Sequence, residues 1–378
     1  MHTPLRITFI VILLSCLTPF ISSGQTDTTL NLTQWGGSIL TGLNSPGKTN
    51  PPSSHNPFGL ELTYSRVGTS RKAWEACNCF AKTGVYVNYY QLGNPTVLGQ
   101  TAGAGIFFEP LIGYRHRLYG SVRASLGISY LSRYFNAETN PTNQFVSLPV
   151  SNMIAARAAL HYRLTPNWQS VLSVQFGHIS NGGTKQPNNG LNLPTIGIGT
   201  IYSPQPDGLP VNFIRNAPNS FNHWFARATA FGSIRIISRF DPYASKDLFK
   251  EKEQWVTKMW GADLVGGYRL TRQHAVSVGI QYIDDRYLKT LMLSRPNFQY
   301  RQASILAGYE FWYGRFTVQA HYAWNFVVPA FNGYIRHYHQ FQRYSLLYQL
   351  SNGFTFGVGV RADRETTKGF HVLTGWVL

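Results

Sequence analysis

The chain has 378 residues, of which 43% are hydrophobic, 15% aromatic and only 13% charged, against about 25% charged in an average soluble domain. This balance excludes a disordered chain, which needs few aromatic residues and dense charge. It also excludes a helical membrane protein, because no mature segment has about 18 consecutive apolar residues. A β-rich protein remains. The net charge of +17 indicates an anionic partner, but scattered basic residues without zinc-ligand spacing do not indicate nucleic acid.

The first 24 residues are predicted to be a signal peptide. Arg6 precedes the apolar run 7–14, and small residues at positions 22 and 24 predict cleavage before Gln25. Two alternatives are a transmembrane anchor and a lipoprotein signal that ends at Cys16. Each of these would direct the protein out of the cytoplasm.

The segment 25–57 is rich in Pro, Ser, Asn and Gly and is predicted to be a weakly ordered lead-in with at most one strand. The segment 58–378 alternates apolar residues with small or polar ones, in strands of about 10 residues that have aromatic residues near their ends. Short turns alternate with long polar loops. These features are typical of outer-membrane barrels. We therefore expect an all-β fold, a transmembrane antiparallel β-barrel of roughly 14 strands (range 12–16) in the outer membrane of a Gram-negative bacterium.

Two features fit this pattern less well. The loops 69–83 and 204–221 are long where the alternation calls for short turns. Cys77 and Cys79 are two residues apart, too close for an unstrained bridge in an extended strand, so the sequence favours two unbridged small residues there.

A candidate catalytic pair lies near the end of one predicted strand. Side chains two apart share a face of a strand, so His178 and Ser180 continue the apolar, lipid-facing side that begins at Leu172, Val174 and Phe176. A histidine beside a serine is the minimum needed for an activated hydroxyl nucleophile. The twelve residues from Trp168 to Ser180 would span roughly 30 Å of membrane, which predicts a site at the outer rim.

A third residue is expected to orient the imidazole. After the loop 181–190 the chain returns as a second strand, and Asn192 falls on its lipid-facing side, where its carbonyl oxygen can accept the ring N–H of His178. Asn181 and the backbone amides near Gly182 and Gly183 are expected to bind an oxyanion. The predicted site is therefore catalytic His178, Ser180 and Asn192, with Asn181 and Gly183 at the oxyanion position.

The run from His178 to Gly190, His-x-Ser-Asn-x-Gly-x-Lys-Gln-Pro-Asn-x-Gly, resembles the signature of the outer-membrane lipid A 3-O-deacylases of the PagL type. The resemblance implies that His178 is the general base, Ser180 the nucleophile, and Asn181 with Gly183 the oxyanion site. That family carries an acid 14 positions after the histidine, whereas this chain has Asn192. The same core with an asparagine at that spacing resembles outer-membrane phospholipase A, whose triad is Ser-His-Asn. The close match covers some 15 to 20 residues.

The expected function is an outer-membrane serine esterase that removes an ester-linked acyl chain from lipid A in lipopolysaccharide, without a cofactor or metal. The first alternative is an outer-membrane phospholipase A, for which calcium would be considered. The alternative from another class is a non-catalytic porin or adhesin. Two weaker candidates are His337 with His339, favoured as residues of an aromatic girdle, and Glu109, favoured as a strand-end residue over a buried acid near the site.

Overall fold

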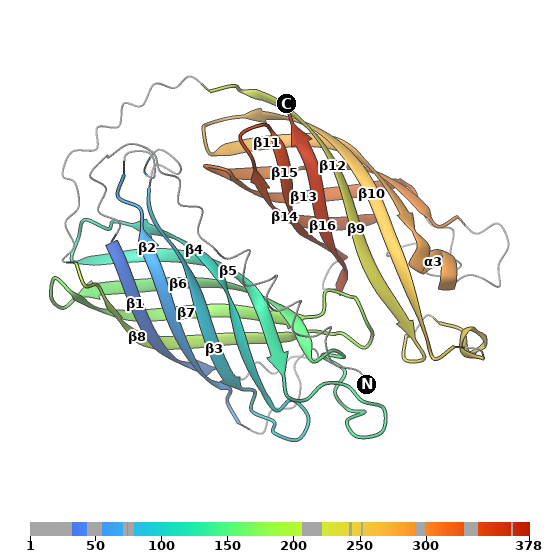
Figure 1. Ribbon diagram of the computed structural model, residues 1–378, viewed down its shortest axis with the longest axis horizontal. Coiled ribbons are helices and arrows are strands. Elements are labelled where there is room, and N and C mark those ends of the chain that lie inside the picture. The colour runs from blue at the N-terminus through green and yellow to red at the C-terminus, as the bar shows by residue number, and fades with distance from the viewer. Residues whose placement is uncertain are drawn as a thin grey trace, which may run out of the picture.

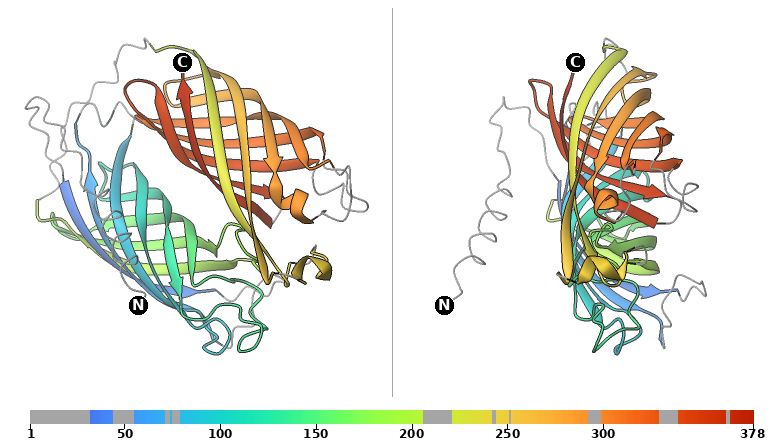
Figure 2. Two further views of the ribbon diagram at one scale, coloured as in Figure 1. Left: turned by 45° about the vertical axis from the view of Figure 1, so that its right-hand side comes forward. Right: turned by 90° about the vertical axis from the view of Figure 1, so that its right-hand side faces the viewer.

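A computed structural model describes residues 32–43, 55–70, 74, 79–205, 221–241, 244–250, 252–291, 299–328, 339–363 and 366–378. The predicted signal peptide, 1–24, lies outside these residues. Within them, sixteen antiparallel strands form two closed barrels of eight strands each, which lie side by side (Figures 1 and 2).

Each barrel is an up-and-down meander whose last strand closes on its first. The first barrel contains β1 (Leu32–Gly42), β2 (Phe58–Val67), β3 (Phe80–Gln91), β4 (Gln100–Ile112), β5 (Leu118–Leu131), β6 (Val150–Arg163), β7 (Trp168–Ser180) and β8 (Leu191–Tyr202). The second contains β9 (Trp224–Ser238), β10 (Gln254–Arg269), β11 (His274–Asp285), β12 (Arg301–Tyr313), β13 (Phe316–Val327), β14 (Gln340–Gln349), β15 (Phe354–Asp363) and β16 (Thr366–Val377). A 3-10 helix, η1 (Lys246–Phe249), and a short helix, α3 (Arg286–Leu291), lie in its connections. The barrels close where β1 pairs with β8 and β16 pairs with β9.

The all-β antiparallel barrel class is confirmed, but one barrel of roughly 14 strands is wrong. Two-residue periodicity identifies strands one at a time, whereas closure depends on pairing between distant strands such as β1 and β8. The long connection 204–221 joins the two barrels, which is why it interrupts the alternation. The segment 25–57 contributes β1, so the first barrel begins at Leu32 and not at Phe58.

Most short connections lie at one end of the barrels and most long ones at the other; the exceptions are the long connection between β2 and β3 and the short one between β15 and β16. The turns between β4 and β5, β6 and β7, β10 and β11, β12 and β13, and β14 and β15 are short, and they share an end with the link 203–223. The loops 132–149, 181–190, 239–253 and 286–300 occupy the other end, called the outer end below. Cys79 is disulfide-bonded, so the expectation of an unbridged residue is wrong; Cys16 and Cys77 lie outside the described residues.

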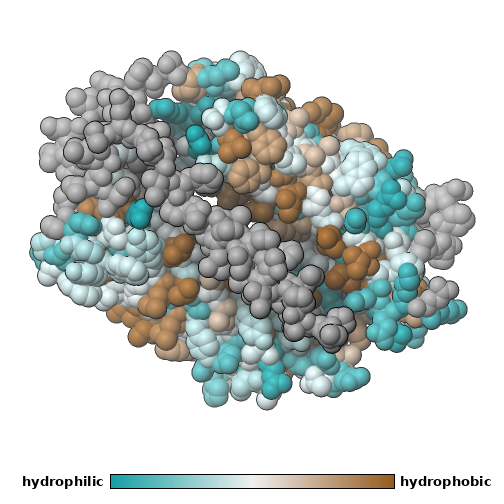
Figure 3. Space-filling model, viewed as in Figure 1, coloured by the Kyte–Doolittle hydropathy of each residue, from teal (hydrophilic) through white to brown (hydrophobic). Residues whose placement is uncertain are grey.

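Side chains that point away from the barrels are mainly apolar. On β7 the outward residues Leu172, Val174 and Phe176 are 53–57% exposed, while Ser173 and Gln175 point inward and are buried. In the space-filling view, brown apolar patches lie on the walls and teal residues gather over the loops that carry η1 and α3 (Figure 3). This alternation is that of a barrel with an apolar exterior. No helix among the described residues is long and apolar enough to cross a membrane.

The interior of each barrel is filled by paired charges. In the first barrel, Glu61 accepts two hydrogen bonds from Arg123 at 2.8 and 2.9 Å. It also forms an ion pair with Arg157 at 2.8 Å. In the second barrel, Arg227 binds Glu310 through both terminal guanidinium nitrogens at 2.9 and 3.0 Å. All these side chains are buried. Eight strands leave an interior about wide enough for side chains, so neither barrel has the water-filled lumen of a large porin.

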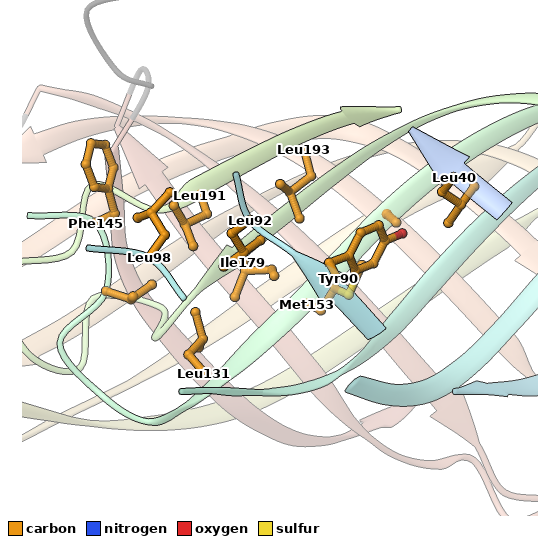
Figure 4. Packing of buried hydrophobic residues seen from close by; sticks show 12 residues of the cluster. Leu40, Tyr90, Leu92, Leu98, Leu131, Phe145, Met153, Ile179, Leu191 and Leu193 are labelled. Carbon is orange, nitrogen blue, oxygen red and sulfur yellow. The ribbon is translucent and has the colours of Figure 1, made fainter. Parts of the chain in front are cut away.

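An apolar plug closes the outer end of the first barrel. Ile179 on β7 and Leu191 and Leu193 on β8 point inward and pack with residues of β1, β3, β6 and the loop 132–149 (Figure 4). The polar inward face that begins at Ser173 therefore turns apolar at the outer end of the hairpin. This plug anchors the β7–β8 hairpin from inside the barrel. The outward residues of the hairpin are not used by the plug.

Candidate active site

The β7–β8 hairpin brings together two of the predicted catalytic residues. His178 and Asn192 are directly paired across the antiparallel ladder, and their side chains both point outward. The His178 Nδ1 lies 2.7 Å from the Asn192 Oδ1. Because an amide oxygen only accepts hydrogen bonds, this contact requires Nδ1 to carry the proton, which leaves Nε2 free to accept one.

The edge of the imidazole that bears Nε2 lies against Gly190. A methyl group built on Gly190 would lie 3.0 Å from Nε2 and closer still to Cε1 of His178. Gly190 also has a φ of +75°, a conformation that residues with a Cβ rarely adopt. Glycine is therefore required here both by the backbone and by the ring, and Gly190 fixes one side of the imidazole.

Ser180 is the last residue of β7, at the outer end, and is only 6% exposed. Its Oγ accepts a hydrogen bond from the backbone N–H of Gly182 at 3.3 Å. Gly182 and Gly183 have φ values of +66° and +77°, and within the described residues the N–H of Gly183 has no hydrogen-bond partner. His178 and Ser180 share the outward face, but no hydrogen bond joins their side chains in this part of the chain.

Asn181 holds the loop together. Its side-chain amide donates to Ser147 Oγ at 3.0 Å and to the Lys185 carbonyl at 2.7 Å. Its backbone N–H donates to Asn188 Oδ1 at 3.0 Å. The structure therefore commits the donors of Asn181 to its own loop and to Ser147, whereas the amide of Gly182 lies beside the serine.

The loop 132–149 supports the hairpin loop from the side of the barrel mouth. The N–H groups of Asn189 and Gly190 donate to the carbonyls of Gln144 at 3.1 Å and Phe145 at 2.9 Å. Phe145 is in turn buried in the apolar plug. The backbone that carries Gly190, and with it the position of His178, is thus tied to the interior of the first barrel.

The weaker candidates lie elsewhere. Glu109 points into the first barrel, where it binds Lys82 at 3.5 Å and His161 at 3.3 Å, so it belongs to the interior charge network and not to the site. His339 lies just before β14, and His337 falls outside the described residues. Across the described part of the chain, no three His, Cys, Asp or Glu side chains are grouped to hold a metal ion.

Several residues of the site were not predicted from the sequence. Asn188 and Gly190 belong to the quoted motif, and their fixed spacing was a signal that they serve the same loop. Ser147 and Phe145 are more than 30 residues away from the residues they support, and nothing local in the sequence marks them. Their contribution depends on the way in which two outer loops meet.

Family models match segments in both barrels of the chain. Residues 59–200 match the family model described as lipid A 3-O-deacylase (PagL). Residues 233–371 match the model described as acyloxyacyl hydrolase, C-terminal domain. The two matches correspond closely to the two barrels and together span most of the chain. A search of curated proteins found no match.

Among solved structures, the chain is similar to Neisserial surface protein A, with 12% identity, a TM-score of 0.29 and coverage of 45% of this chain and 95% of that one. It is also similar to the Acinetobacter baumannii outer membrane protein Omp33, with 9% identity, a TM-score of 0.17 and coverage of 93% and 100%. The two family matches show that the chain belongs to the PagL-type family of lipid A deacylases, hydrolases of the Gram-negative outer membrane.

Proposed function

We propose that the protein is an outer-membrane serine esterase that hydrolyses an ester-linked acyl chain of lipid A. The observation that carries this proposal is the 2.7 Å contact between His178 and Asn192, on the same outward face as Ser180. A histidine, an asparagine and a serine are costly on a membrane-facing surface unless they have a function.

In the proposed reaction, Ser180 Oγ attacks the ester carbonyl carbon and its proton passes to Nε2 of His178. The tetrahedral intermediate then collapses, the bond to the alkoxide oxygen breaks, and His178 returns the proton to that oxygen. Water next attacks the acyl-enzyme, again with His178 as base, and releases the fatty acid. Asn192 keeps Nδ1 protonated throughout and stabilises the orientation of the ring.

Proton transfer requires Ser180 Oγ to approach His178 Nε2. Rotation about the Cα–Cβ bond of Ser180 moves Oγ between the side of Gly182 and the side of the imidazole. Catalytic hydrogen bonds commonly tighten only once the substrate is bound, so the separated pair fits an enzyme without substrate. The N–H groups of Gly182 and Gly183 would then receive the oxyanion.

The location of the hairpin suits an acylated lipid as substrate. Below the site, the outward side chains of β7 form an apolar surface along which acyl chains can pack. Above it, polar outer loops can meet the sugar headgroup, and the net charge of +17 favours phosphorylated substrates. The ester bond of lipid A lies between these two regions.

Mass spectrometry of lipid A from cells with and without the protein tests this function. Expression of the wild-type chain should reduce the mass of lipid A by one acyl chain, and Ser180→Ala should not. Unchanged lipid A together with intact phospholipids in both strains would contradict the proposal.

A phospholipase A is the second candidate, because Asn192 and not an acid orients the histidine. The same extracts distinguish the two, since a phospholipase would generate lysophospholipids and leave lipid A intact. A porin is disfavoured because the charges inside both barrels are buried and paired.

A further inference from the structure

The closing seam of the second barrel is open at its outer end. β9 and β16 are paired only from Arg227 to Gly232 on β9 and from Val372 to Val377 on β16. Beyond Gly232, β9 continues to Ser238 and pairs there with β10 alone. One backbone edge of β9 is therefore available to another segment.

The loop 181–190 of the first barrel, called the catalytic loop below, occupies this edge. The N–H of Ile236 donates to the carbonyl of Thr184 at 2.6 Å, within a parallel bridge between the loop and β9. The hydroxyl of Ser238 reaches the carbonyl of Gln186 at 3.4 Å. The loop thus adds a short strand to the open edge, the same interaction by which extended peptides bind sheets.

A side chain of the second barrel also covers the turn beside the nucleophile. A methyl group built on Gly182 would lie 2.7 Å from the Cβ of Phe370, which belongs to β16. Gly182 is the residue whose N–H binds Ser180 Oγ. Phe370 is therefore in contact with the backbone that would supply an oxyanion donor.

The open edge of β9 is itself firmly held. Ile237 is fully buried in a cluster formed by the outer loops of the second barrel, with Phe249, Tyr287, Leu288 and Leu291. The guanidinium of Arg235 stacks on the ring of Tyr287 at 3.4 Å, and the Tyr287 hydroxyl donates to Asp241 at 2.6 Å. These contacts make the extension of β9 a rigid surface rather than a fraying strand end.

We propose that the second barrel is a working part of the active site: the opening between β9 and β16 holds the catalytic loop so that the N–H groups of Gly182 and Gly183 face the reacting carbonyl. Ile236 and Phe370 are positioning residues in this arrangement. The inference rests on the proposed esterase function, and it explains why an esterase whose catalytic residues all lie in one barrel carries a second.

The backbone contact is tested with Ile236→Pro in the full chain, because proline removes the donated N–H and is tolerated on an open strand edge. Ile234→Pro is the matched control, since its N–H points to the same edge but does not bind the loop. A fluorophosphonate probe measures the reaction at Ser180. Ile236→Pro should lower the maximal labelling rate about 100-fold, at the lower end of what loss of an oxyanion donor costs, with the probe concentration at half-maximal rate unchanged. Equal rates in both variants would overturn the proposal.

The side-chain contact is tested with Phe370→Ala, and Phe356→Ala removes the same atoms from the outward face of neighbouring β15 as its control. Phe370→Ala should slow labelling several-fold and speed amide hydrogen exchange in residues 181–186. Phe370→Leu should restore most of both, because it restores the carbon at the Cγ position, which lies 3.6 Å from a methyl group built on Gly182. Unchanged exchange in both Phe370→Ala and Ile236→Pro, or faster exchange with unchanged labelling, would overturn the proposal. A wild-type chain that never labels would instead contradict the esterase function, and hydrogen exchange would still decide whether the second barrel holds the loop.

Discussion

The last hairpins of the two barrels occupy equivalent positions but differ in chemistry. In the first barrel, β7 and β8 are joined by the loop 181–190 and present His178, Ser180 and Asn192 at the outer end. In the second, only two residues separate β15 from β16, and the outward residues, such as Phe356 and Val372, are apolar. The barrel scaffold is therefore shared, and the candidate chemistry lies at the outer end of one hairpin.

The interiors of the two barrels are, in contrast, built alike. Each contains a buried glutamate held by arginine, Glu61 with Arg123 and Glu310 with Arg227. Each also contains a serine–histidine contact, Ser121 with His161 at 2.8 Å and Ser277 with His321 at 2.9 Å. Because both barrels have these inner pairs, we interpret the pairs as structural, whereas the outward site lies on the first barrel.

The largest expected effect is loss of the catalytic pair. Ser180→Ala and His178→Ala should each lower deacylation about 10⁴-fold or more, and the double variant should be little worse, because a nucleophile and its base act as one unit. Both variants should keep normal heat modifiability, since the side chains lie outside the packed interior. Wild-type activity of both single variants on every acyl ester would show that the site is elsewhere.

Next in size is removal of an interior glutamate, which should affect both barrels alike. Glu61→Ala leaves Arg123 and Arg157 buried without a counter-charge, and Glu310→Ala does the same to Arg227; each should cost about 3–5 kcal/mol of unfolding free energy. Thermal unfolding in detergent, followed by electrophoretic mobility, gives the measurement. Glu138→Ala, at an exposed loop position, is the control. A large loss of stability in only one of the two variants would contradict the proposed equivalence of the two interiors.

A smaller effect is expected from the residue that orients the histidine. Asn192→Ala should lower activity about 100-fold, because the imidazole loses both its orientation and its tautomer preference. Asn192→Asp should retain much of the activity or exceed it, since a carboxylate accepts the same N–H more strongly. Activities are compared on lipid A in mixed micelles. If Asn192→Ala equals the wild type, the contact with His178 has no part in the reaction.

The site was more predictable from the sequence than the fold around it. The relation between His178 and Asn192 follows from local rules, two-residue periodicity and the reach of one hairpin. Closure into two barrels depends on the pairing of β1 with β8 and of β9 with β16, across intervals of more than 100 residues. The sole local sign of it was the length of the connection 204–221.

The same division applies within the site. The residues that the motif contains lie together because they belong to one hairpin. Phe145 and Phe370, which hold that loop from two sides, come from another loop and from another barrel, so their role appears only in three dimensions. Ile179, Leu191 and Leu193 point inward although the inner face of β7 is polar at Ser173 and Gln175, because they form the apolar plug at the outer end of the barrel.

The smallest predicted effect tests how closely the loop must fit the imidazole. Gly190→Ala should lower the turnover rate about 10-fold: the left-handed backbone costs a residue with a Cβ roughly 1–2 kcal/mol, and the new methyl group pushes against the ring of His178. Gly177→Ala is the matched control on the same hairpin, because a methyl group there meets Met153 and Leu193 at ordinary distances of 3.5 and 3.7 Å. Steady-state kinetics should give a reduced kcat with little change in KM for Gly190→Ala. The substitution displaces the imidazole of His178, whereas the outward apolar side chains of β7 that would bind the acyl chain stay in place. Equal kcat values for the two variants would mean that the reaction tolerates a methyl group against the imidazole. The close contact between Gly190 and His178 would then be only a consequence of the turn.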